Sequence, residues 1–313
     1  MFIYHFDFPS SINGKNLLYF IKENAMSIVT NKELLTRAKE GKYAVAAFNT
    51  NNLEYTQAIL QAASELNAPV IVEAAQSEID YMNGHVFVAM VRAMARDLKI
   101  PVGIHLDHGP SYEEAIRCIN YGFTSVMYDG SSHSLDENIA NTKKVVEAAH
   151  ACGVSVEGEI GVIGQAADSP EGPIDESKIG LADPVECERF VKETGVDVFA
   201  AAIGNAHGIY KKKPELRFDL LKDIAARTNV PLVLHGGTGI PLEDIRTAIT
   251  LGVSKINFST VMRKGGIETL TKTLNDNPGD WDYMKLLTPA REKMVAIAKE
   301  HILMCMSDGK AWN

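Results

Sequence analysis

The chain has 313 residues, of which 46% are hydrophobic and 23% charged, and a chain of this size and composition buries a large core on folding. A disordered or fibrous protein is therefore excluded. With 31 basic and 40 acidic side chains the formal net charge is −9, which gives no electrostatic reason to expect binding to nucleic acid or to an anionic membrane.

The N-terminus lacks the pattern of a secretory signal, and no apolar run approaches the ~20 residues of a membrane span. The four cysteines, which are Cys118, Cys152, Cys187 and Cys305, lie far apart and form no Cys-x-x-Cys pair. This spacing argues against a disulfide framework or a structural zinc site. A cytoplasmic location is expected.

Residues 1–25 do not join the pattern of the rest of the chain. They are interpreted as an N-terminal appendage, the alternative being a packed helix over Lys15–Glu23. A helix with Thr30 or Asn31 as its cap is then predicted to run to Lys39.

From Lys42 onward, short β-branched runs alternate with longer amphipathic runs, which is typical of βα units around a parallel sheet. The predicted strands are Tyr43–Phe48, Pro69–Ala74, Val102–Leu106, Ser125–Tyr128, Val154–Ile160, Asp197–Ile203, Pro231–Leu234 and Lys255–Phe258. The predicted helices are Leu53–Leu66, Val86–Leu98, Tyr112–Tyr121, Asp136–Cys152, Pro184–Thr194, Leu216–Arg227 and Leu242–Leu251.

Eight units of about thirty residues each favour an α/β fold with one closed (β/α)8 TIM barrel over an open doubly wound sheet. No Gly-x-Gly-x-x-Gly follows the first strand, where a dinucleotide-binding fold carries it. A further helix, Pro289–Met304, is expected after the eighth unit. No linker divides the chain, so residues 26–313 are predicted to form a single barrel domain.

Polar residues gather where the predicted strands end, which is the face of a barrel that carries the chemistry. His108, His207 and His235 follow three different strands, and each is followed by glycine. Three imidazoles with an open fourth position make a catalytic Zn²⁺ site. The alternative for each single histidine is a hydrogen-bonded structural role.

Three carboxylates accompany these histidines. Asp107 adjoins a proposed ligand and is suited to proton transfer, with orientation of a histidine as its alternative. Asp129 and Glu159 are candidate ligands of a second divalent or monovalent cation or of an alternative position of the first cation. The alternative is that they belong to a hydrogen-bond network. Strand alternation sets His105 apart from His108, which favours a structural or supporting role for His105.

A phosphate site is predicted after strands seven and eight, where barrels commonly bind phosphate with backbone N–H groups. Its candidate residues are Gly236, Gly237, Thr238, Asn257, Phe258, Ser259 and Thr260, with Lys211 from the Lys211–Lys213 run adding positive charge.

These motifs resemble the class II, metal-dependent ketose-bisphosphate aldolases, the group that contains the fructose- and tagatose-bisphosphate enzymes. The resemblance runs from about Met26 to the last helix. It is carried by Ala47–Glu54, Ile104–Gly109, Glu157–Gly161, Asn205–Gly208 and His235–Gly239. The His-x-Asp-His element at His105–His108 is the most specific of them.

The resemblance implies that His108, His207 and His235 bind zinc and that Asp107 is the proton donor. It also implies that Gly208 joins Gly236–Thr238 and Asn257–Thr260 in the dihydroxyacetone-phosphate site, while Asp129 and Glu159 serve a second or displaced cation. The expected reaction is aldol cleavage of a ketose 1,6-bisphosphate, fructose or tagatose, to dihydroxyacetone phosphate and glyceraldehyde 3-phosphate. A homodimer or homotetramer is expected by the same analogy.

One segment departs from the family pattern, because Ala167 stands where a catalytic loop glutamate is expected. Either Asp168 or Glu171 takes that role, or the reaction is slower or different. A family member that acts on another ketose, or that has become a binding or subunit protein, is therefore kept as an alternative.

Two other enzyme classes are disfavoured. A Schiff-base aldolase needs a buried lysine in the barrel, yet the predicted sixth strand has none and Lys255 begins the eighth strand rather than ending it. A barrel metallohydrolase typically has a His-x-His pair on its first strand, which Tyr43–Asn49 lacks.

Overall fold

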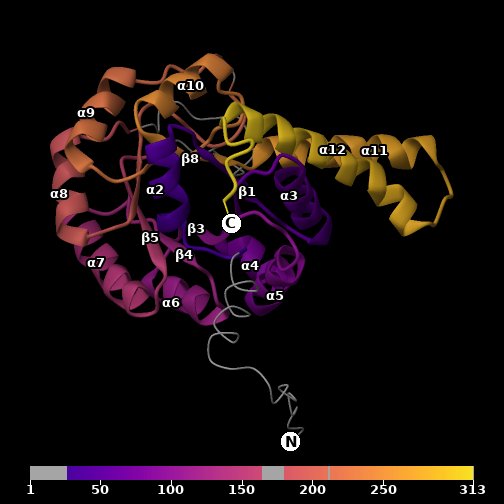
Figure 1. Cartoon of the computed structure of the whole chain (residues 1–313), viewed down its shortest axis with the longest axis horizontal. Coiled ribbons are helices and arrows are strands. Elements are labelled where there is room, and N and C mark those ends of the chain that lie inside the picture. The colour runs from indigo at the N-terminus through magenta and orange to yellow at the C-terminus, as the bar shows by residue number, and fades with distance from the viewer. Residues whose placement is uncertain (1–26, 164–179, 211, 313) are drawn as a thin grey trace, which may run out of the picture.

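The structure, a computed structural model, describes residues 27–163, 180–210 and 212–312. Eight parallel strands pair in chain order, and β1 pairs with β8, so the sheet closes into the predicted barrel (Figure 1). The strands are β1 Val45–Asn49, β2 Val70–Ala74, β3 Val102–Gly109, β4 Ser125–Tyr128, β5 Ser155–Ile160, β6 Val198–Ala201, β7 Leu232–Leu234 and β8 Val253–Phe258.

Helices accompany the strands, most of them on the outside of the barrel (Figure 1). They are α2 Asn31–Gly41, α3 Leu53–Glu65, α4 Gln76–Met82, α5 Gly84–Ala95, α6 Tyr112–Tyr121, α7 Leu135–Ala151, α8 Pro184–Thr194, α9 Phe218–Thr228, α10 Leu242–Thr250, α11 Thr260–Asp276 and α12 Tyr283–Met304. None of the described helices is both long and apolar enough to span a bilayer.

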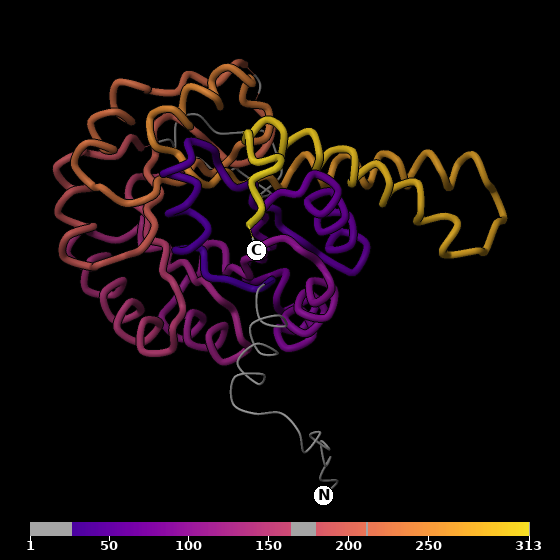
Figure 2. Tube along the Cα trace, in the orientation of Figure 1, coloured from indigo at the N-terminus to yellow at the C-terminus, as the bar shows by residue number. Residues whose placement is uncertain are grey.

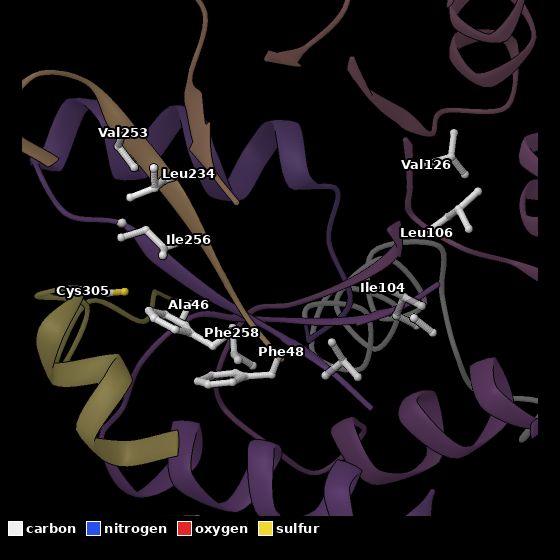
Figure 3. Close-up of a cluster of buried hydrophobic side chains, with 14 of the residues drawn as sticks. Ala46, Phe48, Ile104, Leu106, Val126, Leu234, Val253, Ile256, Phe258 and Cys305 are labelled. Atoms are coloured by element: carbon white, nitrogen blue, oxygen red, sulfur yellow. The ribbon is translucent and has the colours of Figure 1, made fainter. Parts of the chain in front are cut away.

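Strand alternation divides the core into two parts. Ala46 and Phe48 face outward and pack in the large cluster between strands and helices, which Figure 3 shows together with Ile256 and Phe258. Val45 and Ala47 face the barrel interior. The same period of two sends the polar residues of other strands into the barrel.

Helix α2 fills the end of the barrel where the strands begin. Its Leu34, Leu35 and Ala38 pack in the inner cluster with Val45 and Val198. The Thr30 side chain caps this helix by accepting from the Glu33 N–H, as the sequence predicts. The inner cluster at this end is therefore apolar.

The C-terminal region differs from the prediction of one added helix at Pro289–Met304. Helices α11 and α12 form a hairpin that projects away from the barrel (Figures 1 and 2). Proline usually marks a first helical turn, but Pro289 lies inside α12. Packing of Leu286 and Ala290 extends the helix through it. Helix α4 was also not predicted.

Candidate active site

Two residues of strand β3 face inward as alternation requires, and a third reaches the site against it. His105 and Asp107 face the interior, whereas Ile104 and Leu106 face the outer core. Regular alternation would turn His108 outward as well. Its backbone has φ +48, and the β3–β4 register shifts between Leu106 and Gly109. This irregularity brings the His108 side chain to the histidine cluster at the barrel mouth.

The structure brings His108, His207 and His235 together. Their ring centroids lie 4.6 Å apart for His108 and His235, 4.8 Å for His108 and His207, and 5.6 Å for His207 and His235. One nitrogen from each lies within 4.8 Å of the others. Three strand ends of a closed barrel therefore converge on one point, as predicted.

Carboxylates orient two of these rings. Nδ1 of His108 donates to Asp129 at 2.7 Å, and Nε2 of His235 donates to Glu157 at 2.8 Å. Such partners fix the tautomer of a metal-binding histidine. The opposite nitrogens, Nε2 of His108 and Nδ1 of His235, consequently face each other at 2.8 Å.

A proton must lie between these two nitrogens, because two lone pairs would repel at that distance. Burial lowers the pKa of His108, but the nearby Asp107, Asp129 and Glu159 raise it more, to about 10. His108 is thus the imidazolium that donates to His235. Burial lowers the pKa of His235 well below its usual value.

The cluster fits a zinc ion on an independent observation. The Nε2 atom of His207 is buried and has no hydrogen-bond partner. Burial and the neighbouring His108 lower the pKa of His207 to about 4, so this ring presents a neutral nitrogen. Three imidazole nitrogens at one point, one of them unsatisfied, form a donor set that zinc accepts.

Asp107 lies beside this point, with both oxygens held. The Asn49 amide donates to Oδ2 and the Asn257 amide to Oδ1, each at 3.0 Å. Oδ1 is 3.9 Å from Nε2 of His108 and 4.0 Å from Nδ1 of His235. Burial raises the pKa of Asp107, but His108 and His235 lower it more, to below its usual value.

Asp129 and Glu159 are close to His108, with donor atoms of all three within 4.8 Å. Asp129 already accepts from His108 and from Ser131. A second cation there would share Asp129 with the hydrogen bonds from His108 and Ser131. Burial and the charge of Asp129 raise the pKa of Glu159 well above its usual value, and its Oε2 has no partner.

The loops after β6 and β7 are tied to each other. The Asn205 amide donates to the carbonyl of His235 at 3.0 Å. The Tyr210 hydroxyl accepts from the Ala206 N–H and donates to the Gly236 carbonyl. These bonds fix His207 and His235 relative to each other.

Beside these loops lies a pocket of about 600 Å³ whose lining includes Thr238, Thr260, Lys212, Lys213 and Lys264. The first turn of α11 faces it, and the Val261 N–H donates to the Thr238 hydroxyl. A helix N-terminus together with lysines suits an anion. Lys211 lies outside the described residues.

Comparison with known proteins shows the family to which the chain belongs. Residues 29–310 match the family described as fructose-bisphosphate aldolase class-II. The chain belongs to that family. It is 46% identical over 289 residues to the fructose-bisphosphate aldolase of Geobacillus stearothermophilus, covering 91% of this chain and 99% of the relative. The fructose-bisphosphate aldolase of Staphylococcus aureus strain Mu50 is also 46% identical, over 88% of this chain and 96% of its own.

Among solved structures, the YdjI aldolase of Escherichia coli K12 superposes with a TM-score of 0.78 at 32% identity. The match covers 91% of this chain and all of that one. The metal-dependent aldolase family inferred from the motifs is thereby confirmed, as is the barrel.

Two residues predicted for the phosphate site direct their side chains away from the pocket. The Asn257 side chain faces inward and holds Asp107. The Phe258 side chain faces the outer core, where its ring lies 5.7 Å from that of Phe48, so it does not line the site. Both follow from alternation along β8. Thr238 and Thr260 do line the pocket, and Gly237 and Ser259 adjoin them in sequence.

Sequence reasoning missed the supporting residues Asn49, Glu157 and Tyr210, and misjudged Lys255. Lys255 is the third residue of β8 and is fully buried inside the barrel, so a buried lysine does exist there. Burial lowers the pKa of Lys255, but Glu157 and Glu73 raise it more, to above its usual value. A protonated lysine is no Schiff-base nucleophile, so that class stays disfavoured for a different reason.

We expect Gly236→Ala to distort the loops that carry His207 and His235. Gly236 has φ +65, and a Cβ there would collide with the Ala206 carbonyl oxygen. Gly239→Ala is the matched control, because Gly239 has φ +85 but its nearest neighbour is Tyr210 at 3.5 Å. Gly236→Ala should destabilise by about 1–3 kcal/mol more than the control. Equal free energies of unfolding, from denaturant titration, would refute the close approach.

Zinc binding should release about one proton per site near pH 7, because the proton between His108 and His235 must leave. Since the pKa of His108 is about 10, the proton is present at neutral pH, and zinc affinity should rise as pH increases toward that value. Calorimetry in buffers of different ionisation enthalpy measures the release. Heats that do not depend on the buffer would contradict this arrangement.

Proposed function

We propose that this chain is a zinc-dependent aldolase that cleaves fructose 1,6-bisphosphate into dihydroxyacetone phosphate and glyceraldehyde 3-phosphate. The observation that carries the proposal is the convergence of three imidazoles beside Asp107. Relatives named fructose-bisphosphate aldolase at 46% identity support the substrate. We expect it to act in the cytoplasm.

In this proposal His108, His207 and His235 hold the zinc ion. Bound there, zinc supplies the Lewis acid that stabilises the negative charge developing on the ketose oxygens. Asp129 and Glu157 keep the histidine rings oriented throughout the reaction. Asn205 and Tyr210 keep the two histidine-bearing loops in place.

Asp107 is the proton-transfer group in this proposal. In the cleavage direction a base must remove the C4 hydroxyl proton before the C3–C4 bond breaks. An ionised Asp107, with its pKa lowered by His108 and His235 against the opposing effect of burial, is suited to accept it. In condensation the same carboxyl returns the proton to the aldehyde oxygen. Asn49 and Asn257 hold the carboxylate for both steps.

The phosphate of the dihydroxyacetone half is assigned to the pocket at Thr238 and Thr260. The N-terminus of α11 and Lys264 supply positive potential there. Gly208 and Gly236, both with positive φ, form the turns beside it. This assignment places the phosphate near β7 and β8 and leaves the Asp107 side for the aldehyde half.

A second candidate is a related aldol reaction on another ketose, tagatose bisphosphate included. The relative from Escherichia coli at 32% identity is named only as an aldolase, and Ala167 replaces the expected loop glutamate. Ala167, Asp168 and Glu171 lie outside the described residues. The alternative of a binding or subunit protein without aldolase activity depends on the same loop. Measured turnover decides between it and an enzyme.

We also infer that the protein associates with itself through the α11–α12 hairpin. The hairpin leaves the barrel (Figure 2). It exposes large apolar side chains. Trp281 is 92% exposed, Met284 78% and Tyr283 72%, and Ile267 and Leu274 are exposed on α11. An apolar surface on a projecting arm is unfavourable in water. A second copy of this chain, as expected for an enzyme of this family, would cover it.

Asp107→Asn should lower turnover of fructose 1,6-bisphosphate roughly 10²- to 10⁴-fold while zinc stays bound. His235→Ala should instead lower the zinc content. Coupled-enzyme assays and metal analysis of the same preparations separate the two effects. If Asp107→Asn lost zinc as readily as His235→Ala, Asp107 would be a ligand or an orienting residue and the assigned role would be wrong.

The double variant Trp281→Ser, Met284→Ser should shift the protein toward a monomer, because it removes the most exposed apolar contacts of the arm. Sedimentation velocity over a range of concentrations measures the shift. Tyr81→Ser is the control, as Tyr81 is 80% exposed on α4, away from the hairpin. A wild-type protein that stays monomeric, or an oligomer that both variants leave intact, would refute the arm as the interface.

A further inference from the structure

A chain of buried charges runs through the barrel beneath the histidine cluster. The Lys255 ammonium lies 2.9 Å from Oε2 of Glu157 and 3.3 Å from Oε2 of Glu73. Oε1 of Glu157 accepts from Nε2 of His235 at 2.8 Å. All four side chains are fully buried. Lys255 is thus connected to His235 through the two oxygens of one carboxylate.

Glu73, His105 and Asp107 also bring donor atoms within 4.8 Å of one another, which raises the question of a further metal site. Lys255 argues against a metal ion there, because its ammonium already lies beside Glu73. A second cation at that place would meet the repulsion of a buried positive charge. The ammonium therefore supplies the positive charge that this group of carboxylates needs.

The geometry at Glu157 explains what the ammonium does for His235. A carboxylate has two oxygens and can serve two donors at once. Here one oxygen serves the ammonium and the other serves the imidazole N–H. A buried carboxylate without its ammonium would be an uncompensated charge, which is strongly destabilising. Lys255 thus holds Glu157 in the position from which it reaches His235.

We propose that Lys255 is a positioning residue for the metal site: its ammonium fixes Glu157 so that Glu157 holds the Nε2 proton of His235 and leaves Nδ1 for the metal. The inference rests on the proposed zinc role of His235. Lys255 reaches His235 through Glu157, because one Glu157 oxygen accepts from the ammonium and the other accepts from the imidazole.

The proposal predicts that two substitutions, each of which weakens zinc binding alone, partly compensate each other when combined. In Glu157→Gln, the single amide oxygen is drawn to the Lys255 ammonium, and the NH₂ group turns to His235, where it imposes the wrong tautomer. In Lys255→Met, Glu157 loses its compensating charge. In the double variant no ammonium competes, so the introduced amide oxygen is free to accept from His235.

Zinc affinity, measured by competition with a chromophoric chelator, is the first readout. Each single variant should bind zinc roughly 10- to 100-fold more weakly than the wild type. The double variant should bind more tightly than either single variant. At saturating zinc the KM of Lys255→Met for fructose 1,6-bisphosphate should match that of the wild type, because Lys255 does not contact substrate.

Lys32→Met is the matched control. It removes an ammonium 2.8 Å from the buried Asp197, next to the start of β6 at the opposite end of the barrel. It should leave zinc affinity unchanged. A loss of affinity in Lys32→Met equal to that in Lys255→Met would mean general destabilisation and would overturn the proposal.

A second readout needs neither metal nor activity. The ¹⁵N shifts of the His235 ring in metal-free protein should show the Nε2–H tautomer in the wild type and the double variant, and its loss in Glu157→Gln. If the wild type bound no zinc, the proposed function would fail, while this readout would still decide the role of Lys255. Additive losses in the double variant, or an unchanged tautomer in Glu157→Gln, would overturn it. Should Lys255→Met fail to fold, Glu157→Gln and the double variant carry the test.

Discussion

Polar side chains that point into the closed barrel must find partners on other strands, because α2 closes one end with apolar residues and the strands leave little room between them. Glu157 on β5 meets Lys255 on β8 and His235 after β7. Asn49 on β1 and Asn257 on β8 meet Asp107 on β3. Each group that the chemistry needs is therefore fixed by residues from other strands.

These hydrogen bonds and ion pairs between strands determine both the orientation of the side chains in the site and their charges. Asp129 and Glu157 each accept a hydrogen bond from an imidazole N–H, which leaves the opposite nitrogens aimed at a shared point. His207 adds an unsatisfied nitrogen. Asp107 stands 3.9–4.0 Å from two of these atoms. An aldolase needs a Lewis acid and a proton-transfer group side by side, and the barrel offers places for both.

The sequence predicted the strands, the barrel and the meeting of three histidines because each depends on a local pattern placed at a strand end. It failed where tertiary packing overrides local rules. Pro289 lies within α12 because packing continues through it. His108 turns into the site through a positive φ, which the sequence pattern does not indicate. Strict alternation along β8 places Phe258 outside and both Lys255 and Asn257 inside, so the sequence did carry a signal for these three positions.

The most direct test is to titrate zinc into metal-stripped protein while following cleavage of fructose 1,6-bisphosphate. The account predicts no cleavage without metal and full activity at one zinc ion per histidine cluster, with tagatose 1,6-bisphosphate cleaved more slowly. Full activity in metal-free protein, or covalent trapping of substrate by borohydride, would contradict it.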